Sequence, residues 1–205
     1  TNIFETSEEG VVQIANEIVA KIQDRQREGK FCTIAIGTGA SLRPLFTELI
    51  RKHKDEGVSF RNVVFFNLYE YYPLTEGAGS SFNHLNKLFL SQIDIDRQNI
   101  FTMDGSIPQE AIIEHCRLYE QRIQTFGGLD IVIMGIGREG NIGMNEPGSH
   151  ASSTTRLILI DATSRSEAAH NIGVDNLPPC SITMGINTIM GARKVYMLAW
   201  GEDKA

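Results

Sequence analysis

Short apolar runs alternate along the chain with segments whose apolar residues recur at helical spacing. The runs that predict strands are residues 31–36, 62–68, 100–103, 129–135, 156–161 and 195–200. Their apolar character is continuous rather than alternating, which is typical of strands covered on both faces. Helical segments separate the runs. The pattern therefore predicts an α/β fold that is doubly wound, with helices on both faces of a mostly parallel sheet in the Rossmann-like manner.

The helical segments carry recognisable start signals. The predicted helices begin at Thr6, which has capping-box spacing with Glu9; at Pro44; at Ser80 or Ser81; and at Pro108, which opens a helix over 108–126. Serine and threonine side chains cap helix N-termini, and proline suits a first helical turn. The pair Gly127 and Gly128 predicts the end of the last of these helices.

Three polar segments follow predicted strands and indicate where a site would form. They are residues 37–41, 67–74 and 135–149, and the whole stretch 69–80 is predicted as a loop. In doubly wound sheets, ligands bind outside the carboxyl ends of the strands. We therefore expect these three segments to surround one site.

Composition narrows the function classes. The chain has 205 residues, a net charge of −6 and no basic stripe, which argues against nucleic acid or an anionic membrane as a partner. Its three cysteines have no C-x-x-C spacing, and no apolar run reaches membrane-spanning length. The expectation is a single cytoplasmic domain. The five histidines lack the spacing of a metal site, so neither a metal nor a cofactor is expected.

The sequence GTGAS at 37–41 is a candidate phosphate cradle. Glycines let the backbone approach an anion, and a helix N-terminus offers free N–H groups at its positive end. Thr38 and Ser41 add hydroxyl donors. The G-K-[ST] ending of a P-loop is missing, and Leu42 stands where G-x-G-x-x-G needs glycine. The alternative interpretation is a plain strand-to-helix turn.

Two further segments offer candidate chemical groups. Tyr69 and Glu70 follow the strand predicted over 62–68, and the segment GREGNIGMNEP carries Glu139, Asn141 and Glu146. Neighbouring carboxylates can divide the roles of acid and base. The alternatives are a surface loop with aromatic packing for the first segment and a glycine loop with solvated acids for the second.

Taken in order, the motifs resemble one family. IGTGAS, FFNLYEYYPL, GIGREGNIGMNEPGS, ITMGINTIM and AWGEDKA together look like the glucosamine-6-phosphate deaminase/isomerase family, whose relatives include the 6-phosphogluconolactonases. The resemblance runs from about residue 30 to the C-terminus. The match at Met144 to Pro147 favours the deaminase branch. The family fold is doubly wound α/β, and relatives continue past the GEDKA motif, so we expect residues 1–205 to form one domain that lacks a C-terminal helical part.

The resemblance implies a sugar-phosphate ligand. The family's phosphate-binding positions match Thr38, Gly39, Ala40, Ser41 and Lys204. A family arginine on the lid falls near 165–170, where Arg165, Ala168 and His170 are all candidates. The implied partner is a small-molecule sugar phosphate, and a homo-oligomer is left open.

The family's catalytic positions are substituted in this chain. Tyr69 stands where the family has the proton-transferring aspartate, Asn141 where it has the ring-opening histidine, and Glu139 where it has a second aspartate. Glu70 and Glu146 match. The family reaction opens the sugar ring, moves a proton between C1 and C2 and releases ammonia. Tyrosine has a reference pKa of about 10 and asparagine does not titrate, so weak or altered activity is expected.

Two alternatives differ in class from a weak deaminase. One is a catalytically silent domain that binds or senses amino-sugar phosphates. The other is a lactonase-like hydrolase, which fits less well because that chemistry also uses the missing histidine. Residues alone do not separate a slow enzyme from a silent binder.

Overall fold

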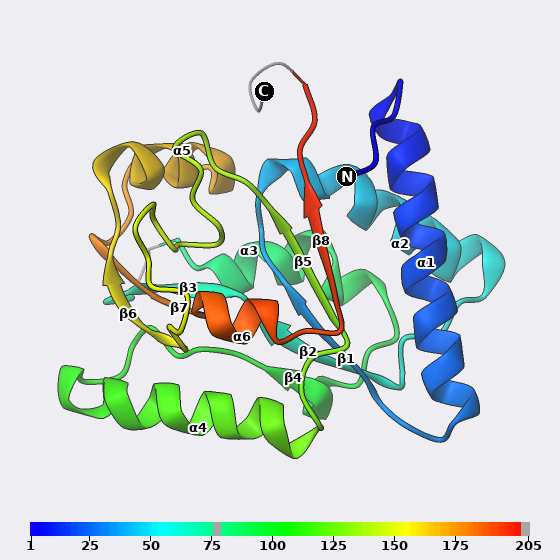
Figure 1. The fold of residues 1–205 in the computed structure, drawn as a ribbon, viewed down its shortest axis with the longest axis horizontal. Helices are drawn as coiled ribbons and strands as arrows, with labels where there is room; N and C mark the ends of the chain where they lie inside the picture. The colour runs from blue at the N-terminus through cyan, green and yellow to red at the C-terminus, as the bar shows by residue number, and fades with distance from the viewer. Residues whose placement is uncertain (76–78, 202–205) are drawn as a thin grey trace.

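A parallel sheet forms the centre of the structure, a computed structural model that describes residues 1–75 and 79–201. Its strand order is β4-β2-β1-β5-β8, and every pair in it is parallel (Figure 1). The strands are β1 (Cys32–Ile36), β2 (Val63–Asn67), β4 (Ile100–Phe101), β5 (Ile131–Gly135) and β8 (Lys194–Leu198). The order places β1 at the middle, with the chain progressing outward in both directions, which is the doubly wound arrangement.

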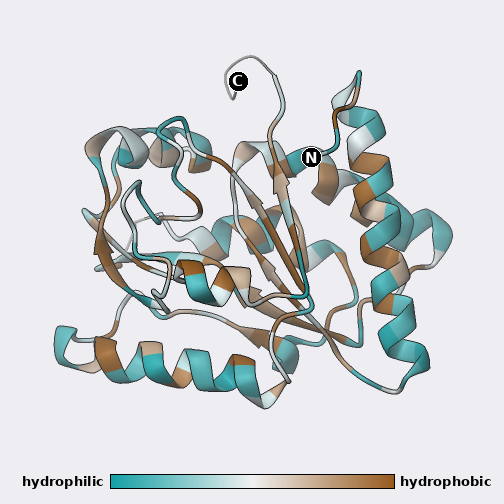
Figure 2. Cartoon of the chain, in the orientation of Figure 1, coloured by the Kyte–Doolittle hydropathy of each residue, from teal (hydrophilic) through white to brown (hydrophobic). Residues whose placement is uncertain are grey.

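Helices cover both faces of this sheet. They are α1 (Ser7–Arg27), α2 (Arg43–Glu56), α3 (Ser81–Leu88), α4 (Ile112–Thr125), α5 (Ala162–Ile172) and α6 (Ile186–Met190). Alternate residues of β1 enter two separate cores. Ile34 packs in one with residues of α1, α2 and α3, and Ala35 in the other with residues of α4, α5 and α6. Figure 2 shows the apolar strands between helices whose outer faces are hydrophilic. The predicted fold class is confirmed.

A second, smaller sheet changes two of the predictions. Strands β3 (Tyr69–Tyr72), β7 (Cys180–Thr183) and β6 (Arg156–Leu159) form an antiparallel sheet in the order β3-β7-β6. The prediction of a loop over residues 69–80 is therefore wrong for its first four residues. The strand predicted over 156–161 exists, but it is not part of the parallel sheet. Strands β3 and β6 both pair with β7, a short strand that is distant from β3 in sequence.

The helix starts follow the predicted signals closely. Thr6 accepts a hydrogen bond from the backbone N–H of Glu9, and Ser80, rather than Ser81, caps α3 by accepting from Asn83. Pro44 lies in the first turn of α2. Pro108 precedes a short 3-10 turn, and α4 proper begins at Ile112. Helices α5 and α6 were not predicted.

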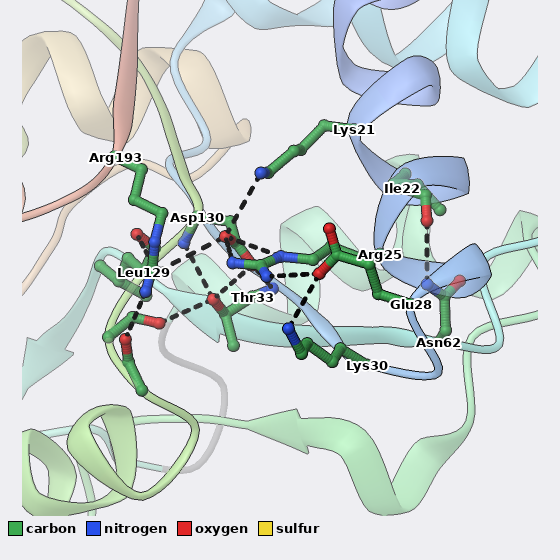
Figure 3. Close-up of polar contacts among 12 residues, drawn as sticks. Lys21, Ile22, Arg25, Glu28, Lys30, Thr33, Asn62, Leu129, Asp130 and Arg193 are labelled. Atoms are coloured by element: carbon green, nitrogen blue, oxygen red, sulfur yellow. Dashed lines mark hydrogen bonds and ion pairs between the residues drawn. The ribbon is translucent and has the colours of Figure 1, made fainter.

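The amino ends of β1 and β5 are joined by a buried carboxylate (Figure 3). Asp130, only 2% exposed, accepts hydrogen bonds from Arg25 of α1 and from the backbone N–H and hydroxyl of Thr33, at 3.1 and 3.2 Å. Lys21 and Arg193 add ion pairs at 3.9 and 3.5 Å. Burial alone would raise the pKa of Asp130, but the hydrogen bonds and neighbouring cations hold it below its usual value. The carboxylate thus links helix α1 to the sheet.

Among the described residues, no helix combines the length and the apolar character that a membrane crossing requires.

We expect Asp130→Asn to lower the free energy of unfolding by about 3 kcal/mol at neutral pH, since it leaves buried donors without a charge partner. Urea unfolding measures this. A carboxylate with a depressed folded pKa stabilises above its unfolded pKa of about 4, and that stability is lost as the pH falls through the folded pKa. The gap between the proteins should therefore narrow below about pH 4. The control is Glu28→Gln, which removes an exposed partner of Arg25 and should change stability little. Equal stability of Asp130→Asn and wild type would contradict the role assigned to Asp130.

Candidate functional site

A cavity of about 360 Å³ lies at the carboxyl ends of the central strands. Its walls come from the loop after β1, the residues at the end of β2, the glycine-rich loop after β5 and helix α5. Six of the ten candidate site residues line it: Thr38, Gly39, Ala40, Ser41, Tyr69 and Asn141. Residues from each of the three polar segments, 37–41, 67–74 and 135–149, line this one cavity.

The loop after β1 leads directly into a helix. The backbone N–H of Gly37 donates to Ile133 at 3.0 Å and so continues the register of the parallel sheet. Residues Ala40–Leu42 form one 3-10 turn before α2 begins at Arg43. This strand–turn–helix geometry brings the loop to the N-terminal end of α2, where the helix dipole favours an anion.

Tyr69 closes the cavity beside this loop. Its hydroxyl lies 2.6 Å from Oγ1 of Thr38, and Thr38 in turn lies 3.3 Å from the hydroxyl of Ser81. Tyr69 is 6% exposed and Thr38 is 1% exposed. Burial raises the pKa of Tyr69 above its ordinary value, against the opposing hydrogen bond with Thr38. Near neutral pH the group is therefore a protonated phenol that can exchange hydrogen bonds but cannot accept a substrate proton.

Asn141 forms the wall on the glycine-loop side. A tight turn precedes it, in which Gly140 donates to the carbonyl of Gly137 at 3.0 Å and Gly137 donates to the carbonyl of Asn141 at 2.9 Å. The side-chain amide donates to the carbonyl of Gly143 at 3.2 Å. A Cβ on Gly137 would lie 1.7 Å from Oδ1 of Asn141, so glycine is needed there. The site thus holds a neutral amide in a fixed orientation.

Glu70 has a different environment from its neighbour Tyr69. It is 2% exposed and does not line the cavity. Its two carboxylate oxygens accept hydrogen bonds from the backbone N–H groups of Tyr71, Ser81 and Phe82 and from the hydroxyl of Ser80, at 2.8 to 3.0 Å. Burial nevertheless raises its pKa, because desolvation outweighs these donors. The carboxyl group is engaged by the N-terminus of α3.

Two other candidate carboxylates, Glu139 and Glu146, also lie apart from the cavity wall. Glu139 is exposed, and Glu146 is half-buried with Oε1 at 3.4 Å from the backbone N–H of Asp161. Neither lines the cavity. Lys204 falls outside the described residues. Within residues 1–75 and 79–201, no cluster of His, Cys, Asp and Glu side chains could hold a metal ion.

Helix α5 supplies a wall that the sequence patterns did not identify. Its cavity-lining residues are Ser164, Glu167, Ala168, His170 and Asn171. The available signals were an aspartate N-cap, Asp161, which accepts from Thr163, and a left-handed Gly173 at the C-terminus. Of the three candidates for the family's lid arginine, Ala168 and His170 line the cavity and Arg165 does not.

A second concave region lies elsewhere. It is an open groove of about 680 Å³ between α4 and the start of β6, and it contains none of the candidate residues. Its volume is the larger, but the smaller cavity holds the converging polar groups and lies at the strand ends where ligands of such folds bind.

A family model and two similar relatives indicate the same protein family. The family model described as glucosamine-6-phosphate isomerases/6-phosphogluconolactonase matches residues 5–205. A putative glucosamine-6-phosphate deaminase-like protein of Bacteroides thetaiotaomicron is 57% identical over all of this chain, which spans 31% of that relative's length. The glucosamine-6-phosphate deaminase of Bacillus velezensis is 32% identical over 94% of this chain and 80% of its own.

Solved structures agree with this result. A monomeric glucosamine-6-phosphate deaminase superposes with a TM-score of 0.86 at 30% identity, covering 95% of this chain and 79% of that one. The 6-phosphogluconolactonase of Thermotoga maritima superposes with a TM-score of 0.73 at 18% identity, covering 99% and 84%. The latter likeness concerns the fold alone.

The contacts of Glu70 predict a structural effect. Glu70→Ala should lower the free energy of unfolding by about 2–4 kcal/mol, because the N–H groups of Ser81 and Phe82 at the start of α3 and that of Tyr71 in β3 lose their acceptor. Chemical denaturation followed by circular dichroism measures the change. Glu139→Ala is the matched control, since it removes an exposed carboxylate and should leave stability nearly unchanged. If both variants unfold alike, the cap assigned to Glu70 is disproved.

Proposed function

Because the chain belongs to the glucosamine-6-phosphate isomerase/6-phosphogluconolactonase family, we propose that its cavity binds an amino-sugar phosphate and turns it over weakly or not at all. The relatives named as glucosamine-6-phosphate deaminases make glucosamine 6-phosphate the first candidate ligand. The cavity volume of about 360 Å³ is compatible with one monosaccharide phosphate.

The phosphate end of the ligand is assigned to residues 38–41. All four residues line the cavity at the N-terminal end of α2. N–H groups and the helix dipole at such a position stabilise an anion. Lys204 enters the proposal on the family resemblance alone, as a cation for the same phosphate.

The sugar end is assigned to Tyr69 and Asn141. The observation that carries the proposal is the buried hydrogen bond of 2.6 Å between Tyr69 and Thr38. By the family resemblance, Tyr69 stands at the position of a proton-transferring carboxylate. Burial raises the pKa of Tyr69 further above neutrality. Asn141 can orient a sugar hydroxyl but cannot carry a proton. Positioned acid–base groups contribute about 10²–10⁴-fold each to a rate, so deamination should be slow.

A second function is favoured by the same observation. A domain that keeps its ligand cavity and lacks a base at two positions suits a silent binder that reports on amino-sugar phosphates. This chain spans about a third of the length of its Bacteroides thetaiotaomicron relative, so the activity of a whole protein of that kind would include parts outside this sequence. Ammonia release separates the two functions: slow turnover supports the enzyme, and binding without turnover supports the sensor.

The phosphate assignment predicts selective binding. Isothermal titration calorimetry should show glucosamine 6-phosphate binding at least about tenfold more tightly than glucosamine, since charge-assisted hydrogen bonds are worth about 1.5–3 kcal/mol. Thr38→Val with Ser41→Ala should reduce the preference. Equal affinities for the two sugars in the wild-type protein would remove the phosphate cradle from the proposal.

The catalytic assignment predicts that activity can be raised by substitution. The double variant Tyr69→Asp with Asn141→His should release ammonia from glucosamine 6-phosphate about 10²-fold faster than wild type, or more, because it restores two titrating groups. The control is Tyr69→Asn with Asn141→His, which matches the shape of the first variant without its carboxylate. Comparable unfolding curves for the two variants show that both fold. Rapid turnover by the wild-type protein would instead refute the proposed loss of the proton relay.

A further inference from the structure

One side chain joins helix α5 to the proposed phosphate loop. The side-chain amide of Asn171, in the last turn of α5, donates to the backbone carbonyl of Thr38 at 2.9 Å. Asn171 and Thr38 both line the cavity, and they come from two different parts of its wall, helix α5 and the loop after β1. The hydrogen bond therefore fixes the spacing between those two parts at this point.

A second residue, from outside the cavity, holds Asn171 in place. The guanidinium of Arg43, at the start of α2, donates from Nη2 to the backbone carbonyl of Asn171 at 2.5 Å and to its Oδ1 at 3.1 Å. The first bond satisfies a carbonyl at the C-terminal end of α5, where the helix dipole favours a cation. The second fixes the side-chain amide, so that its NH₂ group is directed at Thr38.

The rest of α5 has few buried anchors. Of its eleven residues, Ser164 and Ala169 are buried. Ile172, at the end of the helix, packs beside Gly79. A Cβ on Gly79 would lie 2.5 Å from Cδ1 of Ile172. Since little apolar area holds the cavity-facing part of α5, polar contacts with the loop have a large share in setting its position.

We propose that Arg43 and Asn171 are positioning residues, which hold α5 against the loop 37–41 and thereby fix the width of the cavity around the sugar. The inference rests on the proposed function for the identity of the ligand. It goes beyond that function by assigning a role in ligand affinity to Arg43, a residue that does not line the cavity. Arg43 acts on the ligand through Asn171 and not by contact.

The test uses the full chain with the variants Arg43→Ala, Asn171→Ala and the pair combined. The probes are glucosamine 6-phosphate and inorganic phosphate. Arg43→Ala should weaken glucosamine 6-phosphate binding about fivefold, the effect of one hydrogen bond, and should leave inorganic phosphate binding little changed. The combined variant should bind no more than about twofold more weakly than Asn171→Ala, because the two residues act as a unit. Arg43→Lys, which keeps the charge and one donor, should recover part of the loss.

Hydrogen exchange provides a readout that needs no ligand. The amides of residues 162–172 should exchange faster in Arg43→Ala than in wild type, while those of β1 and β5 keep their protection. Arg51→Ala is the control on α2, because Arg51 is exposed and its ion pairs are with Glu48 and Glu56 of its own helix. Ser166→Ala is the control on the exposed side of α5. Both controls should behave like wild type in exchange and binding.

The outcomes separate the inference from the proposed function. If the wild-type protein binds neither probe, the proposed function fails, and faster exchange of α5 in Arg43→Ala still supports the positioning role. Unchanged exchange of α5 overturns that role whatever binds. Equal weakening of both probes also overturns it, because the effect would then come from the phosphate loop and not from the wall around the sugar.

Discussion

The buried carboxyl group of Glu70 is the constraint on which the site geometry depends. It receives the free N–H groups at the start of α3 while its own backbone lies in β3, so one residue ties a helix to the small sheet. Successive side chains of a strand point to opposite faces. With Glu70 turned toward α3, Tyr69 is turned toward the loop after β1, where its hydroxyl meets Thr38. A change at Glu70 would therefore alter the cavity without touching a ligand.

The main features of the fold could be predicted because they are local. Continuous apolar runs marked the five central strands, and Thr6, Pro44 and Ser80 marked three helix starts. Strands β3 and β7 could not be predicted in the same way. Each has only four residues, and they pair with each other across a long stretch of sequence, Tyr69 with Thr183 and Tyr72 with Cys180. Such contacts between distant segments leave no periodic pattern in the sequence.

Some residues of the candidate site could be predicted from adjacent sequence, and others are positioned by contacts with distant segments. A strand, a glycine-containing turn and a helix start are adjacent in sequence, so the loop 37–41 could be identified directly, and so could the turn that carries Asn141. The candidate carboxylates could not be assigned, because whether Glu70 faces a ligand or a helix end is decided by its partners in β7 and α3. The resemblance placed a lid near 165–170, but the helix α5 was not predicted there, because few of its residues are buried and its helical periodicity is weak.

The position of Asp130 has a consequence for how such a protein can change over evolutionary time. Asp130 and Thr33 fasten the amino ends of β5 and β1, whereas Thr38 and Asn141 follow the carboxyl ends of the same two strands. Sites without shared partners contribute to stability nearly independently. The end of the sheet that holds the helix α1 can keep the domain folded while residues at the other end are exchanged one by one. Catalytic groups can then be lost, and new ligand preferences acquired, within a scaffold whose folding is secured elsewhere.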